Sequence, residues 1–219
     1  GFAVDISGAQ PGNSVNLTYT DTATNAQREI TIVNVTDPAA LPLQNTTNAN
    51  PFKVGVDFSA PMASILSTLN TALGSSASLT FSGSGSTLRV TDNGIGASKV
   101  NAASVTKTIS SLQSGNPQMA LFTDGSALYT GAITSSGLQM TGLAGRIGVN
   151  GAVVTNPSKI SVYNTSPATP AGDTTRSDFL YSQLTTSVFS YSPTTGLGSA
   201  SQPFTGTVSN YLQQFLSIQ

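Results

Sequence analysis

The feature that most constrains the fold is one stripe of large apolar side chains between Pro61 and Gly74. Its members recur at the spacing of one helical face: Met62, Ile65, Leu66, Leu69 and Leu73. Pro61 suits the first helical position, and Gly74 suits a left-handed stop. Burying five such side chains contributes about 7–15 kcal/mol before chain entropy is counted. We therefore expect a helix that lies across a sheet, and we expect Leu69→Asp to unfold this part of the chain.

Short segments on both sides of the stripe alternate apolar and polar residues, as half-buried strands do. These segments are residues 2–6, 15–19, 28–35, 54–58, 79–81 and 88–90. We expect the first two to form a hairpin through the turn at 10–13, and the last two to form a closing hairpin. The alternation breaks between Ile32 and Val33, which predicts a bulge or a strand buried on both faces. The pattern of residues 1–96 therefore predicts a small, β-rich α+β domain.

The pattern after residue 96 is thinner and predicts a second, mixed strand-and-helix domain over 97–219. Val105, Ile109 and Leu112 have helical spacing, which predicts a helix over 101–112. Short strands are expected within residues 119–122, 127–133, 138–149, 160–163 and 188–191. A further helix is expected to begin near Thr174. The whole chain is thus predicted to be α+β and β-rich.

The last residues carry a second apolar stripe with helical spacing. It consists of Val208, Tyr211, Leu212, Phe215 and Leu216. Because the stripe continues to the end of the chain without a cap, we expect it to open a longer amphipathic helix. Such a face more often docks on a partner than completes a core.

Composition excludes several classes of function. Only 8% of residues are charged and the net charge is -1, so no basic face is available for nucleic acid. Polarity comes instead from 61 serines and threonines. The chain has no cysteine, histidine or tryptophan, which removes disulfides, thiolate or imidazole metal ligands and histidine-dependent catalytic pairs. No apolar run approaches the ~18 residues that cross a bilayer, and because Gly1 is neither an initiator methionine nor part of a signal peptide, we expect the chain to start in mid-protein.

One short motif could carry chemistry. Ser104 and Lys107 have the serine-x-x-lysine spacing of penicillin-interacting enzymes, in which a lysine one helical turn away accepts the hydroxyl proton. The Ser-Asp-Asn and Lys-Thr-Gly partners of that site are missing from the sequence. In a chain this rich in serine the match is expected by chance. We expect Lys107 to lie on a solvated helix face.

The nine carboxylates do not form a recognisable pair or cage. Asp37, Asp92, Asp124 and Asp173 each stand beside turn-forming residues, where capping of a turn is the ordinary role. We therefore predict no catalytic, cofactor-binding or metal-ligating residue.

Four segments of the second half resemble a known family. These are GLAGRIGVN, NPSKISVYNTSPAT, AGDTTRSDFLYSQL and FSYSPTTGLG, which begin at Gly142, Asn156, Ala171 and Phe189. They resemble the C-terminal half of hook-associated protein 1, the family of flagellar proteins that join hook to filament. The likeness is strongest over residues 116–219, whereas the part before it is similar to that family's variable β-rich outer domain. The chain departs from the pattern at Asn150-Gly151, where the family would have Asn-Pro, so a tight turn is expected there in place of a helix start.

The resemblance implies a function in assembly. It implies a secreted, non-enzymatic structural subunit of the extracellular bacterial flagellum, which self-associates in a helical tube and contacts the hook protein and the adjacent junction protein. Because the family's tube-forming contacts lie in terminal helices, these 219 residues alone are expected to be monomeric. A secreted adhesin or carbohydrate-binding β module is the alternative, served by the loops at 37–50 and 164–176. A serine-lysine hydrolase is the third, least favoured hypothesis.

Overall fold

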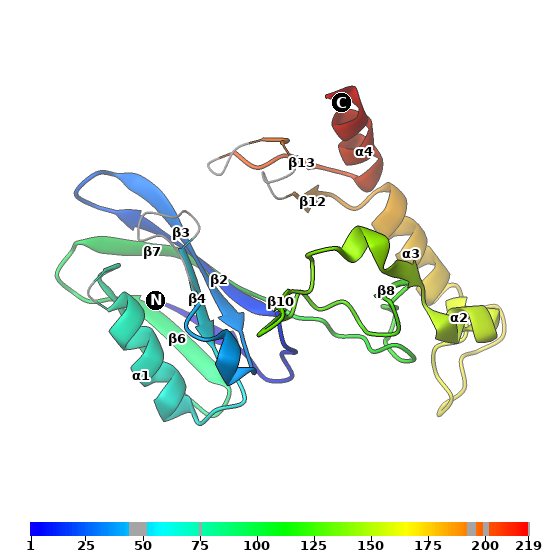
Figure 1. Cartoon of the computed structure of the whole chain (residues 1–219), viewed down its shortest axis with the longest axis horizontal. Helices are drawn as coiled ribbons and strands as arrows, with labels where there is room; N and C mark the ends of the chain where they lie inside the picture. Colours follow the sequence, from blue (N-terminus) through cyan, green and yellow to red (C-terminus); the bar gives the residue numbers. More distant parts are fainter. Residues whose placement is uncertain (44–51, 75, 192–195, 199–201, 219) are drawn as a thin grey trace. The chain divides into compact units, whose positions relative to one another are not determined.

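A computed structural model describes residues 1–43, 52–74, 76–191, 196–198 and 202–218 (Figure 1). Within them the chain forms two compact units. The first contains residues 1–108 and 129–145, and the second contains residues 109–128 and 146–219. Small sheets and four α-helices in the described ranges confirm the predicted α+β, β-rich class. The sequence places its domain boundary at residue 96, whereas the compact units first divide after Thr108.

Two sheets form the first unit. The four-stranded sheet has the order β4-β3-β2-β7, with β4 at Phe52–Val56, β3 at Ala26–Asn34, β2 at Ser14–Asp21 and β7 at Ser98–Thr106. The three-stranded sheet has the order β1-β6-β5, with β1 at Phe2–Asp5, β6 at Thr87–Asp92 and β5 at Leu79–Ser84. Only β3 and β4 pair in parallel; the other pairs in these two sheets are antiparallel.

The helix α1 (Met62–Leu73) forms where the first apolar stripe predicts it. Ile65, Leu69 and Leu73 are buried in one core with side chains from both sheets. The helix is fastened to β5 by the carboxamide of Asn70, which donates to the Phe81 carbonyl and accepts from its N–H, both at 2.9 Å. Gly74 is right-handed, not left-handed as predicted, because the N–H of Gly74 continues the helical bonding to Asn70.

Two sequence predictions for the first unit are wrong. Residues 2–6 and 15–19 do not form a hairpin, since β1 pairs with β6 while β2 pairs with β3 and β7. Residues 101–112 do not form a helix, because the first half of the segment belongs to β7, which lies antiparallel to β2. Hydrogen bonding to the edge of the sheet decides the conformation here, although three apolar residues have helical spacing. Tertiary contacts commonly override such local patterns. Of the two alternatives at Ile32 and Val33, the strand buried on both faces is confirmed.

Residues 129–145 return to the first unit. They contain the hairpin of β9 (Ile133–Thr134) and β10 (Gly137–Leu138) and the 3-10 helix η2 (Leu143–Gly145). Gly12, at φ +89, permits this return, because a Cβ there would collide with the backbone of Gly131 and Ala132. Asp37 caps η1 (Pro38–Ala40) and also accepts from the N–H of Ser135. The predicted loop over 37–50 is described only to residue 43; its remainder lies outside the described residues.

The second unit is assembled from short elements. They are β8 (Phe122–Asp124), β11 (Ile147–Val149), α2 (Gly151–Thr155), η3 (Pro157–Ile160), α3 (Thr175–Thr185), β12 (Phe189–Ser190), β13 (Thr205–Gly206) and α4 (Val208–Ser217). The helix predicted near Thr174 and the C-terminal helix are confirmed as α3 and α4. The strand predicted over 160–163 is wrong, because η3 extends to Ile160 and residues 161–163 form no strand. The tight turn predicted at Asn150-Gly151 is also wrong, since the Asn150 side chain caps α2.

Candidate functional site: an apolar surface on the second unit

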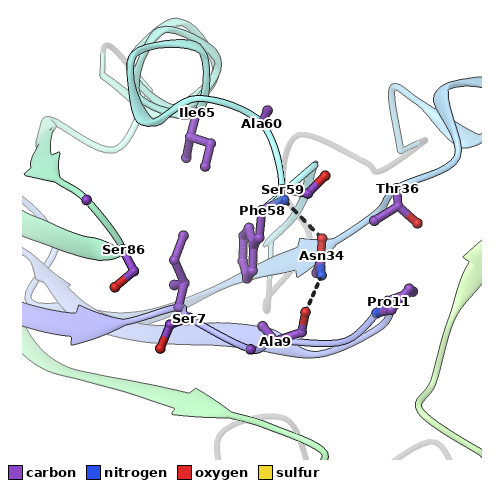
Figure 2. A pocket seen from close by; sticks show the side chains of 13 residues that line it. Ser7, Ala9, Pro11, Asn34, Thr36, Phe58, Ser59, Ala60, Ile65 and Ser86 are labelled. Carbon is purple, nitrogen blue, oxygen red and sulfur yellow. Dashed lines mark hydrogen bonds between the residues drawn. The ribbon is translucent and has the colours of Figure 1, made fainter.

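The first unit contains a recess beside the start of α1 (Figure 2). It has a volume of about 290 Å³ and is lined by hydroxyl, amide and apolar groups, and none of its described lining residues is charged. Figure 2 shows the Asn34 carboxamide at one wall, where Nδ2 donates to the Ala9 carbonyl at 3.1 Å and Oδ1 accepts from the Phe58 N–H at 3.0 Å. The Asn34 amide is thus committed to holding two chain segments together. The recess has no acid–base pair with which to do chemistry.

The predicted Ser104–Lys107 pair does not form a catalytic site. Ser104 lies on β7, where residues three apart point to opposite faces, so the helical geometry of the motif is lost. The Lys107 ammonium instead contacts a carboxylate oxygen of Asp5 at 3.4 Å and donates to the Ser7 carbonyl at 2.7 Å. Hydrogen bonds from Ser7, with smaller contributions from Ser86 and Lys107, hold the pKa of Asp5 well below its usual range. Lys107 therefore joins two segments of the first unit and does not lie on a helix.

The four aspartates expected at turns have structural roles. Asp37, Asp92 and Asp173 each accept a backbone N–H two residues ahead, as turn-capping carboxylates do. Asp124 differs, because both of its oxygens accept from the Arg146 guanidinium, at 2.6 and 3.2 Å. In the described part of the chain no three histidine, cysteine or acidic side chains gather as a metal site would require. The same residues contain no helix long and apolar enough to cross a membrane.

Arg176 organises the second unit. Its side chain is only 2% exposed, and it donates to the carbonyls of Pro117 at 3.1 Å and Lys159 at 2.8 Å, as well as to that of Gly115. The guanidinium also lies 5.2 Å from the centre of the Tyr163 ring. Burial lowers the pKa of Arg176, although arginine is not deprotonated in proteins. One cation thus connects the segment at 115–117, η3 and Tyr163 to the start of α3.

The loop before α3 is held by hydrogen bonds that begin at Tyr163, the residue that contacts Arg176. The Tyr163 hydroxyl donates to Asp173 at 3.1 Å, and Asp173 accepts the N–H of Thr175 at 2.8 Å. These hydrogen bonds, that of Thr175 first, lower the pKa of Asp173. Thr169 holds the middle of the loop by accepting the N–H groups of Tyr163 and Asn164 at 3.1 and 2.8 Å. The 164–176 loop, proposed from sequence as a binding loop, is therefore held by its own polar side chains.

The β8–β11 ribbon exposes one apolar face. Val149 is directly opposite Phe122, and Ile147 follows on the same face two residues from Val149. These three side chains, which we call the ribbon face, are 59% (Phe122), 58% (Val149) and 52% (Ile147) exposed. Thr123 lies on the opposite face and is buried. Three neighbouring large apolar side chains on one exposed face are typical of an interaction surface.

The stripe of α4 is only partly used within the unit. Tyr211 stacks on Tyr191, with ring centres 4.0 Å apart and planes 7° from parallel, and Phe204 and Phe215 pack around this pair. Leu212 and Leu216, on the same stripe, are 50% and 71% exposed. The aromatic half of the stripe therefore docks inside the unit, and the leucine half faces outward.

The unit buries few large apolar side chains in its interior. Among its described residues, Val153 and Leu197 are the buried hydrophobics, while the polar Thr123, Asn150 and Arg176 are also buried. Its order thus depends mainly on hydrogen bonds from Arg176 and Asn150, and much apolar surface is left at the ribbon face and on α4. Sequence reasoning identified the α4 stripe. It missed the ribbon face and Arg176, because strand register and the partners of a single arginine are not visible in sequence spacing.

Comparison with protein-family models, with curated proteins and with solved structures finds no match for this chain.

Proposed function

We propose that the chain is a structural subunit of the bacterial flagellum, which joins hook to filament by self-association in a helical tube. The observation that carries the proposal is the exposed apolar surface of the second unit, formed by the ribbon face and by Leu212 and Leu216 of α4. A catalytic domain binds its substrate in a cleft where a few convergent polar groups provide specificity. An assembly subunit instead presents apolar side chains on its exterior, where a neighbour covers them.

The four segments that resemble hook-associated protein 1 support the same proposal. Two of them lie around Arg176, since NPSKISVYNTSPAT contains η3 and Tyr163 and AGDTTRSDFLYSQL contains Arg176 itself. GLAGRIGVN contains β11, which carries part of the ribbon face. The partners implied are further copies of the chain, the hook protein and the adjacent junction protein, outside the cell. No nucleic acid, membrane, cofactor or catalytic step enters the proposal.

The carbohydrate-binding alternative finds one supporting feature. A cavity of about 430 Å³ in the first unit is lined by Tyr19, Phe52, Arg28 and Glu29, and aromatic and charged side chains together are common in sugar sites. Tyr19 is buried, however, so it presents little ring surface to a ligand. We therefore retain assembly as the proposed function.

Immunoelectron microscopy of the source organism tests the proposal. Antibodies raised against residues 1–219 should label intact flagella in one narrow band at the boundary between hook and filament. Antibodies depleted on the purified chain are the control. Labelling of the cell surface without such a band, or binding of the purified chain to glycans with no flagellar label, would contradict the proposal.

A further inference from the structure

The sequence contains two Asn-Gly pairs, Asn93-Gly94 and Asn150-Gly151. In such a pair the backbone nitrogen of glycine can attack the asparagine side-chain carbonyl, because glycine has no Cβ to obstruct the approach. The reaction needs a side chain that can turn toward the following nitrogen and a site that water reaches. The structure gives the two pairs opposite environments.

Asn150 is held in place. It is 2% exposed, and its Nδ2 donates to the carbonyls of Leu112 and Ala120, both at 2.7 Å. Its Oδ1 accepts the Ala152 N–H at 3.0 Å and caps α2. Attack by Gly151 would break all three hydrogen bonds and leave buried polar groups without partners. The native structure therefore protects this amide.

Asn93 is open to the reaction. It lies in the connection between β6 and β7, and the two residues that follow it, Gly94 and Ile95, are exposed. Its one side-chain hydrogen bond in the described part of the chain is a long one, from the Ile95 N–H to Oδ1 at 3.3 Å. A Cβ built on Gly94, which has a φ of +78°, would meet no atom within 4 Å. Asn93 is itself half-buried, but this one long hydrogen bond restrains its side chain much less than the three that hold Asn150.

The Gly94 nitrogen also has a proton acceptor. Its N–H donates to Oδ1 of Asp92 at 3.2 Å, so a carboxylate oxygen lies next to the proton that this nitrogen must lose. A group that can accept this proton assists formation of the nucleophile, as in general base catalysis.

We propose that Asn93 is a site of spontaneous deamidation and that Asn150 is not. The Gly94 nitrogen bonds to Cγ of Asn93 as the Cγ–Nδ2 bond breaks, and the proton leaves by way of Asp92 with the ammonia. The resulting five-membered imide takes up one water molecule. Opening at Cγ gives aspartate at position 93, and opening at the backbone carbonyl carbon gives isoaspartate. No oxidant, metal or enzyme is needed.

The modification changes the charge of the first unit. Each event adds one carboxylate next to Asp92 and takes the formal net charge from -1 to -2. The isoaspartate product also inserts a methylene into the backbone between β6 and β7. That connection is fastened by hydrogen bonds from Thr22 to the carbonyls of Gly96 and Ala97, so we expect these contacts to loosen in aged protein. This inference depends only on the local surroundings of the two asparagines and is independent of the proposed function.

Timed incubation of the purified chain at mildly alkaline pH tests the proposal. Peptide mass spectrometry should show conversion at Asn93 at least ~10-fold faster than at Asn150, a ratio that corresponds to about 1.4 kcal/mol. In denaturant both pairs should react at similar rates, because only the fold distinguishes them. The Asn93→Ala variant should lose the acidic product on isoelectric focusing while the folded spectrum is retained. Equal native rates, or a native Asn93 slower than Asn150, would overturn the proposal.

Discussion

Removal of the Arg176 side chain should destabilise the second unit selectively. In Arg176→Ala the half-buried carbonyls of Gly115, Pro117 and Lys159 lose a charged donor. Hydrogen bonds to charged groups contribute about 1.5–3 kcal/mol each, partly offset by the cost of burying the cation. We expect a net loss of about 3–4 kcal/mol, which is the sum of these hydrogen bonds less that cost. Arg176→Lys should lose less than Arg176→Ala because it keeps the cation, but it should still be less stable than the wild type because an ammonium cannot reproduce the planar fork of donors.

Hydrogen exchange measures this loss for each unit separately. Amides of α2 and α3 should exchange roughly 10²- to 10³-fold faster in Arg176→Ala, which follows from 3–4 kcal/mol. Amides of α1 in the first unit are the internal control and should not change. Arg146→Ala is the matched variant, because the Arg146 side chain is 45% exposed and pairs with one carboxylate, so its removal should destabilise the unit less than removal of the buried Arg176. Equal effects of the two variants, or an unchanged α3 in Arg176→Ala, would refute the role assigned to Arg176.

Three further predictions concern the core, pH and assembly. Leu69→Ala should lower the stability of the first unit by about 2–5 kcal/mol, because Leu69 is fully buried in its core; urea unfolding would detect it. Hydrogen bonds lower the pKa of Asp173 in the folded chain. The ionised carboxylate therefore contributes its full stabilisation at pH values above the unfolded pKa of about 3.9, and this stabilisation is lost as the pH falls below that value. Nuclear magnetic resonance should show the start of α3 loosening over that range in the wild type, and Asp173→Asn should remove this pH dependence. Leu212→Asp with Leu216→Asp should abolish incorporation into flagella, measured by immunoblot of sheared filaments, whereas Gln213→Asp on the same helix should not.

The sequence predicts the elements that rest on long periodic patterns. Five apolar residues define α1, and five more define α4, because each stripe is long enough to exclude strand spacing. The alternating segments likewise predict β2, β3 and the β5–β6 hairpin.

The errors arise where partners distant in sequence decide the structure. β7 takes its conformation from pairing with β2, although residues 101–112 have weak helical spacing. Asn150 begins α2 because its side chain caps the helix while its amide binds two distant carbonyls. At the candidate site, α4 was predictable from its stripe. The ribbon face was not, since it depends on the register that puts Val149 opposite Phe122.

Cryo-electron microscopy of the hook–filament boundary tests the central claim most directly. The account predicts density at that boundary into which the second unit fits, with Leu212 and Leu216 of α4 covered by a neighbouring subunit. The account would be contradicted if the boundary were built from other chains, or if these leucines faced solvent in the assembled tube.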